Sequence, residues 1–91
     1  MSKPIDFNKD SEILKAIGHP VRLKLITGLM AEYECNVNKM VEKLKLPQST
    51  VSQHLAVLKN RGIIVPRKDG VNTCYEVVDK RVKEIIKILQ S

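Results

Sequence analysis

The sequence predicts a mainly helical α+β domain that carries one small β-hairpin. Apolar residues recur at helical spacing along most of the chain, and after Gly62 the period changes from about 3.6 residues to two. Asp69-Gly70, between the two alternating runs, is a strong hairpin signal. A length of 91 residues allows one modest core. We therefore expect a single domain over residues 1–91, with residues 1–9 as a loose polar lead-in.

The first two helices are separated by Gly18-His19-Pro20. Asp10 is a suitable N-cap for a helix over about 11–17, because its carboxylate can accept from the unpaired N–H groups of a first turn. Pro20 suits the first turn of a second helix that reaches about Ala31, because the N–H that proline lacks would have no partner there. Both segments carry an aliphatic stripe that can pack on a core.

A third and a fourth helix are joined by a short connection. Asn36 is a good N-cap for a helix over 37–44, and Lys45-Leu46-Pro47 leads into a helix over 48–60. Gly62 can end this fourth helix in the left-handed conformation that helix C-termini favour. Two helices joined by a tight turn, the second polar on its outer side, predict a helix-turn-helix.

The last third of the chain predicts the hairpin and a final helix. Residues 63–65 and 73–78 have the composition of paired strands, and Pro66 indicates an edge position. Asp79 can cap a last helix that extends to about Leu89 with one aliphatic side. The order is α-α-α-α-β-β-α, which is that of a winged helix-turn-helix.

The excess positive charge is confined to one stretch. Lys43 to Lys68 contains six of the 16 Lys and Arg residues and none of the ten acids, so it accounts for the formal net charge of +6. Such a local field attracts a phosphate backbone. Readers of RNA and single strands stack bases on aromatic side chains, and this chain has two Tyr, one Phe and no Trp. Double-stranded DNA is therefore the expected partner.

The helix over 48–60 divides into an apolar side and a small polar side. Val51, Leu55 and Leu58 fall within one narrow arc and should anchor the helix to the core. The opposite side presents Ser49, Gln53, Ala56 and Asn60. Amide and hydroxyl groups can address base edges, and the small alanine allows close approach to the groove.

Nine residues are expected to contact DNA: Gln48, Ser49, Thr50, Ser52, Gln53, His54, Lys59, Arg67 and Lys68. Phosphate contacts are expected at the end of this helix from Lys59 and at the β-hairpin, or wing, from Arg67 and Lys68. Arg67 could also enter a minor groove. His54 fits either a phosphate donor or a half-buried packing residue, and the sequence leaves both open. The alternative for the whole set is a solvated surface, although such helix faces usually carry Glu and Lys.

Other classes of function are disfavoured by the sequence. No apolar run approaches the roughly 18 residues needed to cross a bilayer, and Met1 to Asn8 lack a signal-peptide core, so we expect a cytoplasmic protein without a membrane partner. Ser49, Ser52 and His54 share one helix and do not face each other as a nucleophile and a base must. We expect no catalytic residue, no metal and no cofactor.

Three segments make a family resemblance visible. Residues 19–26 (HPVRLKLI), 48–58 (QSTVSQHLAVL) and 62–64 (GII) closely resemble the ArsR (arsenic-repressor-like) family of bacterial winged-helix regulators, over about residues 10–90. The resemblance implies a homodimeric repressor that leaves its operator when an inducer is sensed. It also implies dimerisation through the first and last helices, for whose aliphatic stripes the sequence alone indicates no other partner. Two recognition helices would then lie roughly 34 Å apart on a pseudo-palindromic site.

The sensing residues of the family are only partly present. Tyr33 and Cys35 stand where metal-sensing members often have a Cys-x-Cys pair, and Arg81 stands where zinc-binding members usually have a His, so a metal site of these kinds is not expected. Relatives that sense oxidants or reactive sulfur use a cysteine pair, for which Cys35 and Cys74 are the candidates. Two unpaired cysteines acting as small apolar residues are the alternative. A winged-helix module that binds another protein is a further one.

Overall fold

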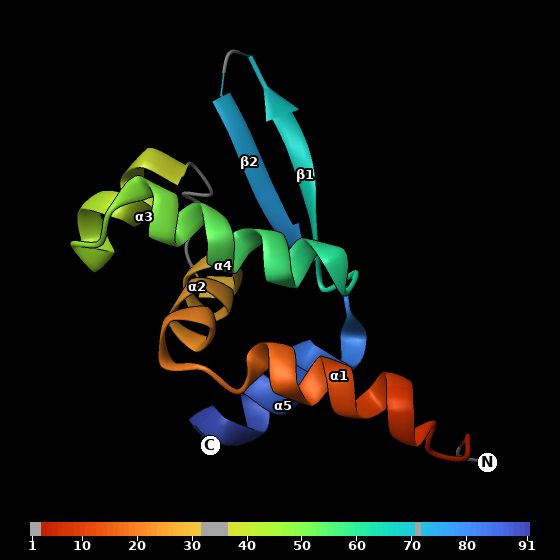
Figure 1. Cartoon of the computed structure of the whole chain (residues 1–91). Helices are drawn as coiled ribbons and strands as arrows, with labels where there is room; N and C mark the ends of the chain where they lie inside the picture. The colour runs from red at the N-terminus through yellow and green to blue at the C-terminus, as the bar shows by residue number, and fades with distance from the viewer. Residues whose placement is uncertain (1–2, 32–36, 71) are drawn as a thin grey trace.

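The computed structural model describes residues 3–31, 37–70 and 72–91, and these form the expected winged helix-turn-helix (Figure 1). The elements are α1 (Phe7–Ile17), α2 (Pro20–Ala31), α3 (Val37–Leu44), α4 (Gln48–Asn60), β1 (Ile64–Asp69), β2 (Asn72–Val77) and α5 (Lys80–Gln90). The order confirms the one expected, and the bounds of α2 and α4 agree with the sequence prediction. Asn36, the expected cap of α3, lies outside the described residues.

The start of α1 was predicted wrongly. The helix begins at Phe7, so Asp10 lies inside its first turn and residues 7–9 are not a loose lead-in. Asp6 is the N-cap, because its carboxylate accepts from the backbone N–H of Lys9 at 3.0 Å. The carboxylate of Asp10 accepts in turn from the backbone N–H of Asp6 at 3.0 Å. This reciprocal pair resembles a capping box and stabilises an extra turn that a single-cap argument overlooks.

One apolar core holds the elements together. It draws on all five helices and both strands. Its buried members are Ala16, Ile17, Leu25, Ile26, Met40, Val51, Leu55, Leu58, Ile63, Ile64, Val77, Val82 and Ile86. The three residues predicted to anchor α4 are among them, which fixes the side that α4 turns outward.

The hairpin is longer than its sequence pattern indicated. β1 and β2 pair antiparallel from Ile64↔Val77 to Asp69↔Asn72, so the ladder extends into the segment expected to be a loop. The turn uses Gly70 at φ +63°, a left-handed value that glycine adopts without strain. Pro66 is accommodated because a two-stranded sheet consists only of edges. The hairpin projects from beside the C-terminal end of α4, away from α1 and α5 (Figure 1).

The last helix is capped as predicted. Asp79 accepts from the backbone N–H groups of Arg81 at 2.9 Å and Val82 at 3.1 Å. Within the described ranges, no helix is both long and apolar enough to span a membrane. Large apolar side chains nevertheless remain exposed on the first and last helices: Phe7, Leu14, Ile88 and Leu89.

Candidate nucleic-acid interface

The outer side of α4 is polar, uncharged and open to solvent. Gln48, Ser49, Ser52 and Gln53 are exposed, whereas Thr50 is half-buried. Within the part of the chain that the structure describes, the side chains of Ser49 and Gln53 form no hydrogen bond to protein groups, so their donors and acceptors are available to a ligand. This is the arrangement that base readout in a major groove requires.

The N-terminus of α4 is open as well. Its N-cap position is Pro47, which supplies no side-chain hydrogen bond to the first turn. The backbone N–H groups there can therefore donate to a phosphate oxygen, and the helix dipole favours an anion at this end. A phosphate held at this point would direct the first turn of α4 toward the groove.

The basic stretch is less uniform than its sequence suggests. Lys59 and Lys68 are exposed, in the last turn of α4 and on β1. Arg61, however, is paired with Glu12 of α1 at 2.9 Å, and Arg67 is paired with Glu76 of β2 at 3.1 Å. Acids distant in sequence thus neutralise part of the stretch, which a count along the chain could not reveal.

His54 lies on the inner flank of α4 in a cluster with His19 and Arg22. Its Nδ1 is 3.2 Å from Nη1 of Arg22, and the centroids of the two imidazole rings are 4.5 Å apart. Burial lowers the pKa of His54, and the positive charges of His19 and Arg22 lower it further. This geometry favours the packing interpretation of His54 over a direct phosphate contact.

Sequence reasoning did not assign a role to His19 or Arg22. Both lie in the segment that carried the family resemblance, and Arg22 also bonds to the backbone carbonyls of Lys15 and Ala16. The arginine therefore connects the end of α1 with the inner side of α4. No spacing rule predicts a contact between residues 32 positions apart.

The two cysteine candidates differ in what can be said of them. Cys74 is half-buried on β2, opposite Arg67 in the ladder, and its sulfur is disulfide-bonded. Cys35 lies outside the described residues. Among the residues described, no group of three or more His, Cys, Asp or Glu side chains could hold a metal ion.

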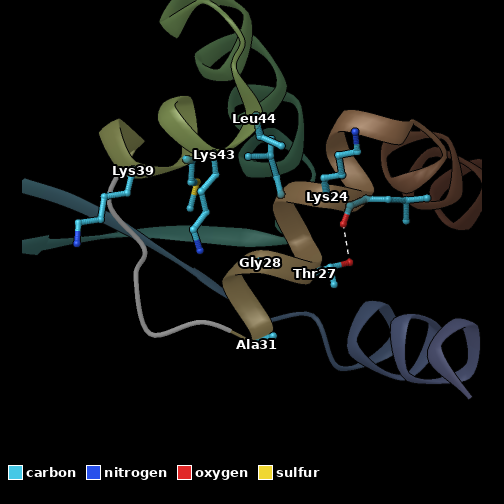
Figure 2. A pocket seen from close by; sticks show the side chains of 10 residues that line it. Lys24, Thr27, Gly28, Ala31, Lys39, Lys43 and Leu44 are labelled. Carbon is cyan, nitrogen blue, oxygen red and sulfur yellow. Dashed lines mark hydrogen bonds between the residues drawn. The ribbon is translucent and has the colours of Figure 1, made fainter.

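A pocket of about 430 Å³ lies between α2 and α3 (Figure 2). Its walls are mainly aliphatic, and three lysines also line it. Gly28 lines it from α2, and a Cβ built there would meet nothing within 4 Å. The hydroxyl of Thr27 donates to the carbonyl of Leu23 at 2.6 Å, so it is already engaged within the helix.

The fold, the polar outer side of α4 and the basic groups beside it together define a winged helix-turn-helix DNA-binding regulator. The sequence model described as "Bacterial regulatory protein, arsR family" matches residues 19–65, more than half of the chain. The chain belongs to the ArsR family of transcription regulators. Because this family regulates transcription, the match also confirms that the chain is not an enzyme.

Several relatives resemble this chain over most of its length. An uncharacterised HTH-type transcriptional regulator of Methanocaldococcus jannaschii is 45% identical over 83 residues, covering 91% of this chain and 93% of that protein. The transcriptional repressor PagR of Bacillus anthracis is 43% identical over 81 residues, covering 88% of this chain and 80% of the repressor.

Solved structures agree with the architecture. The crystal structure of PagR has a TM-score of 0.82 at 37% identity and covers 91% of this chain and 94% of its own. HlyU from Vibrio cholerae has a TM-score of 0.85 at 31% identity and covers 96% of this chain and 94% of its own.

Proposed function

We propose that this chain is a dimeric repressor that reads a specific duplex sequence with α4 in the major groove and is released by an inducer. The observation that carries the proposal is the exposed, uncharged outer side of α4, with Ser49 and Gln53 open to base edges. Lys59, in the last turn of α4, and Lys68, on β1, supply phosphate contacts beside this surface. The name of PagR, a transcriptional repressor, supports the direction of regulation.

A homodimer through α1 and α5 is part of this proposal. Ile88 and Leu89 are 68% and 64% exposed on α5, and Phe7 is 80% exposed on α1. Burying a large apolar side chain contributes about 1.5–3 kcal/mol, so a few such residues offset much of the cost of association. A two-fold dimer then implies a pseudo-palindromic operator with half-sites about 34 Å apart.

Selection of bound duplexes from a random pool tests the proposal. We expect an enriched, pseudo-palindromic sequence, and an affinity that falls steeply as salt concentration rises. Equal binding of selected and random duplexes would contradict it. Weak binding that is insensitive to salt, together with capture of α4 by a protein, would favour the protein-interaction module instead.

One class of inducer is favoured by a specific observation. The disulfide bonding of Cys74 on the wing supports a thiol-based response, in which Cys35 is the candidate partner. A change in thiol state would then alter the position of the hairpin that carries Arg67 and Lys68. Affinity for the selected duplex should differ between oxidised and reduced protein, and Cys74→Ser should remove that difference. An unchanged difference in the variant would exclude this response.

A further inference from the structure

A single guanidinium joins three helices beneath the proposed recognition surface. Nε of Arg22 donates to the carbonyl of Ala16, and Nη2 donates to the carbonyl of Lys15 at 3.4 Å, both at the end of α1. Nη1 of the same group meets Nδ1 of His54 on α4 at 3.2 Å. Arg22 itself lies in the first turn of α2, so its side chain connects α4 with both α1 and α2 and helps to fix the orientation of α4.

This contact has a defined protonation state. A guanidinium can only donate hydrogen bonds, so Nδ1 of His54 must be an acceptor, and the proton of a neutral ring lies on Nε2. The observed arrangement therefore requires a neutral His54 imidazole beside one permanent cation.

We propose that Arg22 is a positioning residue for α4 and that proton uptake at Nδ1 of His54 breaks the contact between Arg22 and His54. The protein then loses its preference for the operator over other duplexes as the pH falls. The proposal rests on the DNA-binding function proposed above. Once Nδ1 carries a proton it has no lone pair to offer, and a donor faces a donor across 3.2 Å. The imidazolium and the guanidinium also repel each other.

The surroundings of His54 all lower its pKa. Burial and the positive charges of His19 and Arg22 lower its pKa. Toward α1, Arg22 meets two carbonyl oxygens, and the ammonium of Lys15 is exposed and paired with Glu12 at 3.6 Å. In the described part of the chain, no carboxylate and no charged group of α3, α4 or β1 is among the causes of this shift. Release therefore begins below the ordinary histidine pKa of 6.5.

Two variants separate positioning from charge. His54→Asn places an amide oxygen near the position of Nδ1, so it can accept from Arg22 without titrating. Arg22→Met removes the guanidinium and leaves an apolar stem of similar length, and Arg22→Lys is a milder second variant. Each protein is titrated at pH 7.5 and pH 5.5 with the duplex selected at pH 7.5 and with a random duplex of equal length. Circular dichroism at both pH values checks that each protein is folded.

The measured quantity is the ratio of the two affinities, because added positive charge strengthens binding to any duplex alike. In the wild-type protein we expect this ratio to fall about tenfold from pH 7.5 to pH 5.5. His54→Asn should show the same affinity ratio at pH 7.5 and at pH 5.5. Both Arg22 variants should show a lower ratio than the wild type already at pH 7.5. Parallel pH profiles of the wild type and His54→Asn would overturn the proposal, as would a full ratio in Arg22→Met. A wild-type ratio near one at pH 7.5 would instead contradict the proposed function.

Discussion

At the scale of single residues, the residues proposed to contact DNA divide by the chemistry of their side chains. Gln53 presents an amide that can make a bidentate contact to adenine, which carries sequence information. Lys59 presents a point charge at the helix end, which a phosphate of any nucleotide satisfies. The two kinds of contact should therefore respond differently to mutation.

Gln53→Ala should weaken binding to the selected duplex by about 1–3 kcal/mol and relax the base preference at one position of each half-site. Lys59→Ala is the matched control on the same helix, and it should weaken binding to all duplexes and reduce the salt dependence. Affinities measured on single-base variants of the operator distinguish the two. A uniform loss in Gln53→Ala would mean that this side chain does not read a base.

The lowered pKa of His54 also predicts how stability depends on pH. A histidine whose pKa is depressed in the folded state binds fewer protons than it does in the unfolded chain, so its contribution is complete above about 6.5 and is lost as the pH falls below that value. Urea denaturation from pH 8 to pH 5 should show a smaller loss of stability in His54→Asn than in the wild type. Identical losses would show that the environment of His54 does not disfavour its charged form.

At the scale of elements, α2 carries a glycine that its helix does not require. Gly28 lies inside α2 without a left-handed φ, and a Cβ at this position would meet open space in the pocket. Gly28→Ala should therefore raise the free energy of unfolding by about 0.5–1 kcal/mol, since alanine restricts the unfolded chain and favours the helix. Thermal and urea denaturation measure the change, and affinity for DNA should not alter. A destabilised variant would indicate that α2 and α3 approach more closely than described.

The elements predicted best from the sequence are those whose ends are marked by residues next to them in the chain. The bounds of α4 follow from Pro47 before it and Gly62 after it, and α5 follows from its Asp79 cap. The start of α1 was missed because Asp6 and Asp10 are equally good caps in isolation. Only the hydrogen bonds from the Lys9 N–H to Asp6 and from the Asp6 N–H to Asp10 decide between them. The hairpin was placed too short because cross-strand pairing continues past its apolar residues.

The candidate site was predicted on its outer side but not on its inner side. Helical geometry alone places Gln53 opposite the anchors of α4. The contact of Arg22 with His54 and the ion pairs of Arg61 and Arg67 depend on tertiary packing, which no spacing within one helix encodes. These contacts change the interpretation of three basic groups and one histidine.

At the scale of the whole molecule, α1 connects the last helix with α4. α1 is linked to α5 by the pair Asp10–Arg81 at 2.9 Å and to α4 by Glu12–Arg61 at 2.9 Å. Both pairs are at the surface, where such bridges contribute little to stability, so core packing provides most of the support. An interface built on α1 and α5 would thus be connected to α4 by packed side chains.

Ile88→Glu should shift the proposed dimer to monomers, because a carboxylate would replace an apolar side chain that is 68% exposed in the single chain. Gln90→Glu introduces the same charge on the same helix and should leave the dimer intact. Sedimentation of both variants gives the result. A stable dimer in Ile88→Glu would place the interface elsewhere on the molecule.

The ion pair on the wing bears on how tightly the protein can hold its target. Arg67 already has a carboxylate beside it in Glu76, so an incoming phosphate must compete for a cation that is occupied. The binding free energy gained at this position is the difference between the Arg67–phosphate pair and the Arg67–Glu76 pair. The displaced carboxylate of Glu76 also remains close to the nucleic acid and repels its phosphates. Such an exchange limits the contribution of the hairpin to DNA affinity, which suits a regulator that has to dissociate from its operator.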